Sequence, residues 1–211
     1  MAAKSKYPEM TERIGIKLGI IFAHVPLTPN QWTLVSLIPA LLGFVALAYY
    51  REMGWGIGLF LVSGVIDAID GGVARVTGSV TNFGAYLDGM VDRVVECLLL
   101  VGLMLFGLPD FVVAGYPTPM WLWLSLLLFV GSGMVSFARA YADHRKVLTD
   151  AKKLRKMGGV LERAERLGLV FGAMLLWYVN PLYANALLLT ALVLSIFTLA
   201  QRIWFVARNA E

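Results

Sequence analysis

The chain has 211 residues, of which 59% are hydrophobic and only 15% are charged, and its formal net charge is +4. A soluble domain of this size carries about 25% charged and about 45–50% apolar residues. Because the apolar excess comes in long blocks that basic residues flank, the composition argues against a soluble protein and against nucleic acid as a partner. An integral membrane protein surrounded by lipid is the first inference.

A short amphipathic segment precedes the apolar blocks. Within residues 8–25, apolar residues recur at helical spacing with Arg13 and Lys17 among them, which predicts a juxtamembrane helix at the membrane surface. We therefore expect an all-α integral membrane protein, with six transmembrane helices preceded by this N-terminal amphipathic helix, in a single domain covering residues 1–211. The predicted spans are residues 31–50, 55–75, 83–106, 120–141, 167–178 and 181–206.

The basic residues are distributed unequally between the two sides of the predicted bundle. With six spans, every Lys and Arg except Arg51 falls on the side that holds the N-terminus, the 76–82 turn, the 143–166 loop and the C-terminus. The positive-inside rule places that side in the cytoplasm. We expect a multi-pass protein of the cell membrane, with both termini cytoplasmic.

Four aspartates interrupt the apolar sequence where the second predicted span ends and the third begins. They are Asp67, Asp70, Asp88 and Asp92. Each pair is three or four positions apart, which places its members on one helix face, and both pairs are expected at the cytoplasmic side. Buried carboxylates repel one another unless a cation lies between them. Oxygen ligands alone favour Mg²⁺, Mn²⁺ or Ca²⁺ over zinc, and two ions sharing carboxylates would suit phosphoryl chemistry.

The aspartates have two other interpretations. They could form ion pairs, such as Asp70 with Arg75 or Asp92 with Arg93, but the nearby positive charges are too few to balance them. They could also line the pathway of a cation transporter. A pathway needs polar residues through the whole membrane depth, and residues 55–64 and 97–106 carry almost none.

The spacing of the aspartates and their neighbours resembles a known family signature. The pattern is Asp67-x2-Asp70-Gly71-x2-Ala74-Arg75-x8-Gly84-x3-Asp88-x3-Asp92. It resembles the signature of the CDP-alcohol phosphotransferases, six-span membrane enzymes of phospholipid synthesis. The resemblance implies that an alcohol attacks the phosphorus of a CDP-linked lipid, either CDP-diacylglycerol or CDP-archaeol, and that CMP leaves.

The same resemblance implies roles for individual residues. The four aspartates would hold two Mg²⁺ or Mn²⁺ ions, and Asp92 would also act as the catalytic base that takes the proton of the acceptor hydroxyl. The positions implied around the CDP-lipid are Asp70, Gly71, Ala74, Arg75 and Thr81.

A second segment, Glu162–Arg166, resembles the inositol-phosphate branch of the family. In that branch a serine and a basic residue at the end of the fourth span, with the first arginine of this segment, hold the phosphate of the acceptor. The resemblance implies inositol phosphate as the acceptor, with glycerol 3-phosphate or serine as alternatives. The residues implied are Ser136, Arg139 and Arg163, with Arg166 and Arg202 as further candidates.

Several of these features have plainer explanations. Arg163 and Arg166, interleaved with glutamates, could form an exposed salt-bridge ladder, and Arg202 could anchor the last span at the interface. The basic loop before Arg163 could be attracted to anionic lipid headgroups. Gly168 and Gly172 indicate close helix packing, which would be compatible with a homodimer.

Overall fold

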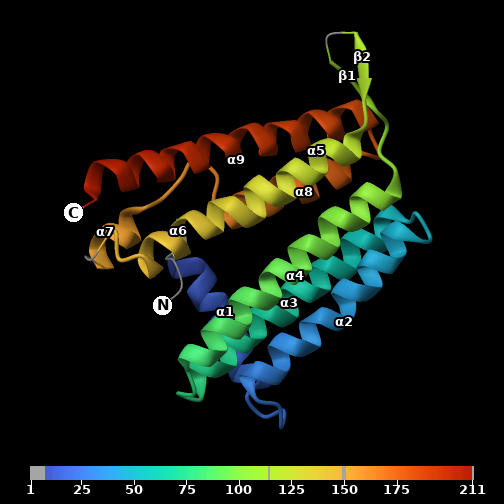
Figure 1. Cartoon of the computed structure of the whole chain (residues 1–211). Helices are drawn as coiled ribbons and strands as arrows, with labels where there is room; N and C mark the ends of the chain where they lie inside the picture. The colour runs from blue at the N-terminus through green and yellow to red at the C-terminus, as the bar shows by residue number, and fades with distance from the viewer. Residues whose placement is uncertain (1–7, 114, 149–150, 211) are drawn as a thin grey trace. The chain divides into compact units, whose positions relative to one another are not determined.

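The computed structural model describes residues 8–113, 115–148 and 151–210, drawn as ribbons in Figure 1. The chain divides into two compact units, residues 1–99 and 100–211, and the division falls inside a long helix.

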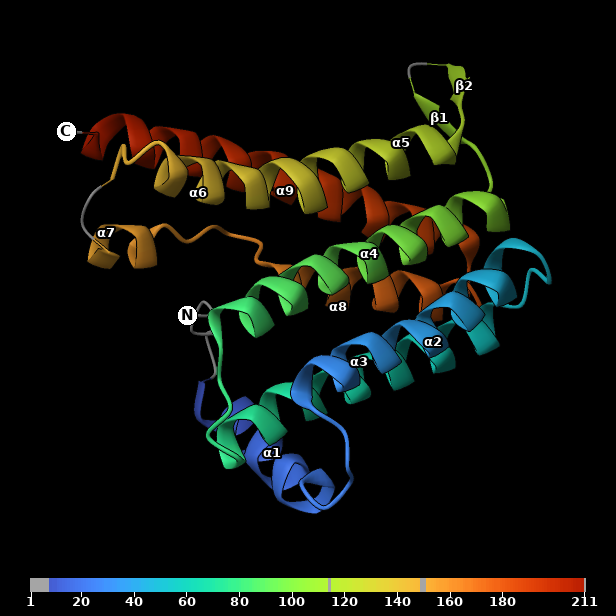
Figure 2. The ribbon, with the colours of Figure 1, turned by 60° about the horizontal axis from the view of Figure 1, so that its bottom comes forward.

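The first unit is helical. It contains α1 (Pro8–Phe22), α2 (Pro29–Ala48), α3 (Met53–Val76) and the larger part of α4 (Asn82–Phe106). Figures 1 and 2 show α2 and α3 side by side and antiparallel, joined by a short loop. A capping box begins α2, because the Thr28 hydroxyl accepts a hydrogen bond from the Gln31 amide at 3.3 Å while the Gln31 side chain accepts from the Thr28 amide at 2.8 Å.

Helix α1 packs on α3 through glycines. A methyl group on Gly72 would overlap the backbone of Gly15 and Gly19, so the two helices approach backbone to backbone. Beside this crossing, Trp32, Ile69 and Val73 form a buried cluster that the apolar side chains of α1 help to cover. The glycine crossing thus anchors α1 to the C-terminal half of α3, where two of the aspartates lie.

The second unit combines helices with one β-hairpin. Strands β1 (Phe111–Val113) and β2 (Tyr116–Thr118) pair antiparallel, with Val112 opposite Pro117. A continuous helix follows, made of α5 (Met120–Leu126), the π-helical segment η1 (Leu127–Met134) and α6 (Val135–His144). Figures 1 and 2 show it alongside the last helix. The remaining helices are α7 (Ala151–Lys156), α8 (Arg163–Leu176) and α9 (Pro181–Asn209).

The helical membrane fold predicted from the sequence is confirmed, and the helices begin and end within a few residues of the predicted spans. Four helices of the described chain are long and apolar enough to cross a membrane, over residues 29–48, 53–76, 120–144 and 181–209. Of the other two predicted spans, α4 carries several charged side chains, and α8 has 14 residues, about 21 Å of helix. The count of six spans and the single-domain organisation therefore stay predictions. The hairpin and α7 lie in segments that were expected to be loops.

Candidate functional site

Three of the four aspartates come together in the first unit. One carboxylate oxygen from each of Asp67, Asp70 and Asp88 lies within 4.8 Å of the others. Helix α3 supplies the first two from one face, and α4 supplies the third. Asp70 is 7% exposed and the other two are half-buried. Carboxylates held this close in a poorly solvated place repel one another, a cation between them would offset that repulsion, and an all-oxygen donor set fits Mg²⁺ or Mn²⁺.

Asp92 lies one turn after Asp88 on α4. It is half-buried and close enough to Asp70 for the two carboxylates to repel each other. It does not belong to the set of three oxygens found among the described residues. The geometry therefore separates a compact group of three carboxylates from a fourth carboxylate one helical turn away.

A hydroxyl group on α2 holds the most buried of these carboxylates. The Thr33 hydroxyl donates a hydrogen bond to the carboxylate of Asp70, and Thr33 is 3% exposed. Two serines make further hydrogen bonds next to Thr33. Ser36 donates to the carbonyl of Thr33 at 2.7 Å, and Ser63 donates to the carbonyl of Ser36 at 2.8 Å. Sequence reasoning missed Thr33. The sequence shows it only as one of several hydroxyl residues inside two otherwise apolar spans, and its pairing with Asp70 follows from the fold.

The residues expected around the CDP-lipid lie near the end of α3. The side chain of Arg75 is exposed and folds back along the helix, so a Cβ on Gly71 would be 3.4 Å from Arg75 Nη1, and one on Gly15 would be 2.7 Å from Nη2. Ala74 is half-buried one residue earlier. The space beside Gly71 is therefore occupied only by the flexible guanidinium group of Arg75.

Thr81 has a structural contact at the start of α4. Its hydroxyl oxygen accepts a hydrogen bond from the Gly84 amide at 2.9 Å, which satisfies a donor that the first turn of the helix leaves unpaired. The Thr81 side chain itself is exposed. Capping α4 accounts for this threonine without a ligand, so its expected contact with the CDP-lipid stays a prediction.

The residues expected to bind the acceptor belong to the second unit. Ser136 and Arg139 are half-buried on α6, and Arg163 is half-buried at the start of α8. Arg202 on α9 is only 7% exposed, and its Nη1 donates a hydrogen bond to the carbonyl of Val135, the residue before Ser136. The side chain is directed inward, so Arg202 is not an exposed interfacial anchor.

The segment that opens α8 is not an exposed salt-bridge ladder. Glu162 and Glu165 form a capping box, in which the Glu162 amide donates to Glu165 Oε2 at 3.0 Å. Arg166 is 1% exposed, one of the most buried large side chains in the described chain. Burying the charge of an arginine costs desolvation energy, which its surroundings have to offset. An arginine that served only solubility would stay exposed. Arg166 therefore belongs to the interior of the unit.

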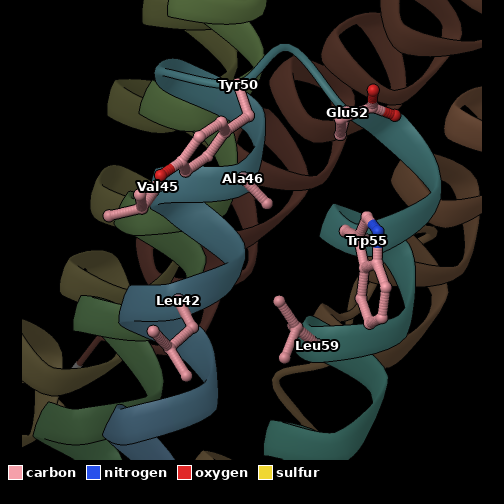
Figure 3. A pocket seen from close by; sticks show the side chains of 7 residues that line it. All are labelled: Leu42, Val45, Ala46, Tyr50, Glu52, Trp55 and Leu59. Atoms are coloured by element: carbon pink, nitrogen blue, oxygen red, sulfur yellow. The ribbon is translucent and has the colours of Figure 1, made fainter.

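An apolar pocket lies between α2 and α3, shown in Figure 3. Leu59 points from α3 toward α2, and the ring of Tyr50, which follows α2 in the chain, lies next to Val45. Glu52 is the one carboxylate in its lining. The pocket is near the start of α3, and Asp67 is about 18 Å further along that helix, so the two features are separate.

Long apolar helices with a partly buried carboxylate cluster define a helical membrane protein with a candidate divalent-metal site. The particular family follows from a comparison of the sequence with family models. The chain belongs to the CDP-alcohol phosphatidyltransferase family, whose model matches residues 26–197. It is therefore a phosphotransferase of phospholipid biosynthesis, as the aspartate signature implied.

Curated relatives resemble the chain over nearly its full length. An archaetidylinositol phosphate synthase from Pyrococcus horikoshii is 31% identical over 208 residues, which cover 99% of this chain and 96% of the relative. A phosphatidylinositol phosphate synthase from Mycolicibacterium smegmatis is 31% identical over 202 residues, covering 92% of this chain and 86% of the relative.

Solved structures share the fold. The phosphatidylinositol phosphate synthase of Mycobacterium tuberculosis, crystallised with CDP-DAG bound, has a TM-score of 0.75 and 24% identity, covering 92% of this chain and 94% of that one. A structure of the same enzyme with manganese and citrate has a TM-score of 0.74 and 22% identity, covering 92% and 88%. At this identity the likeness establishes the fold alone.

Proposed function

We propose that the chain transfers the substituted phosphate group of a CDP-linked lipid to a hydroxyl of inositol phosphate and releases CMP. The cluster of Asp67, Asp70 and Asp88 in a chain of this family supports the transfer reaction. The acceptor is inferred from two relatives, each 31% identical, that are named archaetidylinositol phosphate synthase and phosphatidylinositol phosphate synthase.

In this proposal the four aspartates of the signature hold two Mg²⁺ or Mn²⁺ ions, at least one of them within the three-carboxylate cluster. Bound divalent cations neutralise the diphosphate and stabilise the charge on the leaving CMP. Asp92, which lies outside the compact set of three oxygens, orients the acceptor hydroxyl and accepts its proton. Gly71 leaves room for the cytidine diphosphate beside α3, and Arg75, which lies next to that gap, contributes positive charge.

The phosphate of the acceptor is assigned to the basic residues of the second unit. Arginine presents a planar fork of donors that matches a phosphate, and Arg139 and Arg163 are both partly open to solvent. Ser136 adds a hydroxyl donor on the same helix as Arg139. Arg202 positions this part of α6 through its hydrogen bond to the carbonyl of Val135. The cytoplasmic side of the membrane, where soluble inositol phosphate is available, is the proposed location of the site.

The test is release of CMP by the purified full-length protein. CDP-diacylglycerol and CDP-archaeol are supplied separately with Mg²⁺ or Mn²⁺, and inositol phosphate, glycerol 3-phosphate, serine and free inositol are offered one at a time. We expect release with inositol phosphate, and loss of release when EDTA removes the cation. Release with glycerol 3-phosphate alone would contradict the acceptor, and no release with any acceptor would contradict the transfer reaction.

Matched variants separate the site from general damage. Asp92→Asn is expected to lower kcat by roughly 100-fold or more, the usual contribution of a general base. Asp110→Asn removes a carboxylate that is exposed beside the β-hairpin, so its activity is expected to stay within about two-fold of wild type. Equal activities of these two variants would show that Asp92 is not the base.

A further inference from the structure

A basic hollow of about 600 Å³ lies in the second unit, between the loop after α7 and the last turns of α9. Figures 1 and 2 show α7 and the C-terminal end of α9 on the same side of this unit. The residues of the lining that matter here are Lys156, Gly159, Gln201, Trp204, Phe205 and Arg208. The transfer reaction proposed above uses none of them.

The charge of this hollow is positive. Lys156 and Arg208 are both exposed on its lining, and among the residues that line it in the described chain there is no Asp or Glu. The guanidinium carbon of Arg208 lies 4.7 Å from the centre of the Trp204 ring. This cation–π contact restrains the Arg208 side chain, so its positive charge stays at the hollow. The hollow is therefore complementary to an anion.

The wall opposite α9 is fixed in place. The Val160 amide donates to Gln201 Oε1 at 3.1 Å, and the Leu161 amide donates to the Thr198 hydroxyl at 2.9 Å. A methyl group on Gly159 would overlap the side chain of Thr198, so the loop lies directly on the helix. The hollow thus has a defined shape before any ligand arrives, which lowers the entropic cost of binding.

The end of α9 is expected at the boundary between lipid and water. This helix has 29 residues and is about 43 Å long, whereas the hydrocarbon core of a bilayer is about 30 Å thick. The helix exceeds the core by about 13 Å, so it is long enough for its last turns to reach the headgroup region. Trp204 is 61% exposed there, and tryptophan with arginine at a span end is typical of that region.

We propose that this hollow binds the phosphate headgroup of an anionic phospholipid from the surrounding leaflet. Lys156 and Arg208 contact the phosphate, while Trp204 and Phe205 contact the glycerol and the first carbons of the acyl chains. The aromatic part of the lining favours a lipid over a free anion, because a soluble phosphate would leave those rings in water. None of its lining residues belongs to the aspartate signature, and the proposal does not depend on which acceptor the enzyme uses.

The test compares two lipids with identical acyl chains. Native mass spectrometry of the full-length protein in detergent micelles counts bound phosphatidylglycerol and bound phosphatidylcholine. Each cation near a membrane surface contributes about a five-fold gain for an anionic lipid, so the two together predict roughly a 30-fold preference for phosphatidylglycerol. We expect Lys156→Gln/Arg208→Gln to abolish this preference and Lys146→Gln, an exposed cation outside the hollow, to retain it.

Equal binding of the two lipids by the wild-type protein, or an unchanged preference in the double variant, would overturn the proposal. Displacement of phosphatidylglycerol by millimolar inorganic phosphate or glycerol phosphate would instead identify a site for a soluble anion and would also overturn it. A thermal melt in phosphatidylcholine micelles checks folding. Should the double variant not fold, Arg208→Gln alone is expected to lower the preference about five-fold and Arg208→Lys to retain most of it.

Discussion

Asp70 is the residue on which the candidate metal site depends most. It is the most buried member of the carboxylate cluster, and the Thr33 hydroxyl donates a hydrogen bond to it from a neighbouring helix. Groups that bind a metal-ligating carboxylate orient it and are often as important as the ligand itself. The aspartates could be predicted from the sequence because their spacing is local. Thr33 could not, because its partner is 37 residues away and no periodicity in the sequence connects them.

We predict that Thr33→Val weakens metal binding without destroying the fold. The substitution keeps the shape of the side chain and removes the hydroxyl donor, so the Asp70 carboxylate loses the hydrogen bond that orients it from α2. Loss of such a partner typically costs about 10- to 100-fold in metal affinity. The concentration of Mn²⁺ that gives half-maximal CMP release should rise by at least about 10-fold, with a smaller change in the rate at saturating metal.

Thr33→Ser is the matched control, because it retains the hydroxyl, and its Mn²⁺ requirement should stay within about three-fold of wild type. Ser36→Ala removes a neighbouring hydroxyl that donates to the carbonyl of Thr33 and not to Asp70. Its Mn²⁺ requirement should also stay within about three-fold of wild type. A Thr33→Val enzyme with a wild-type Mn²⁺ requirement would mean that the hydrogen bond to Asp70 has no role in holding the cation.

At the scale of elements, the sequence predicts the helices well and their contacts poorly. Long apolar blocks define α2, α3 and α9. The helix α4 could also be predicted, although it carries several charged residues. The crossing of α1 on α3 could not be predicted, because it depends on which glycine of the Gly71-Gly72 pair faces the other helix. The π-helical segment η1 was also missed, since its residues are as apolar as those of an ordinary span.

Gly72 and Gly71 should therefore respond differently to the same added methyl group. In Gly72→Ala the new Cβ would overlap the backbone of Gly15 and Gly19, which cannot move aside without shifting α1. Overpacking of this kind costs about 1–3 kcal/mol. We expect a clearly lower melting temperature for Gly72→Ala, measured on the purified protein in detergent.

Gly71→Ala provides the comparison. Its Cβ would be 3.4 Å from the end of the flexible Arg75 side chain, which can move, so the melting temperature should change little. The same methyl group would occupy the space proposed for the cytidine diphosphate, and the KM for the CDP-lipid should rise. If both variants melted alike, the close contact between α1 and α3 would not be a feature of the folded protein.

At the scale of the whole molecule, the surface has the character expected of a protein in lipid. Large apolar side chains are exposed along the spans, among them Ile38 on α2, Val65 on α3 and Phe197 on α9. In water such surfaces would cause aggregation, whereas in a bilayer they face acyl chains at no cost. The sequence predicts this from composition alone. It does not settle whether α4 and α8 cross the membrane, because one carries the charges of the site and the other is short.

The six-span arrangement predicts which side of the membrane each loop faces, and cysteine labelling can check this. In a Cys97→Ala background, single cysteines are placed at three exposed positions, as Glu52→Cys, Asp143→Cys and Val179→Cys. These changes leave every Lys and Arg in place, so the charge bias that sets the orientation is preserved. If α4 and α8 both cross, residues 52 and 179 face the outside and residue 143 faces the cytoplasm. A membrane-impermeant maleimide should then label residues 52 and 179 in intact cells, and residue 143 only after permeabilisation.

Labelling of residues 52 and 143 on the same side would show that α4 does not cross the membrane. Labelling of residues 143 and 179 on the same side would show that α8 does not cross it.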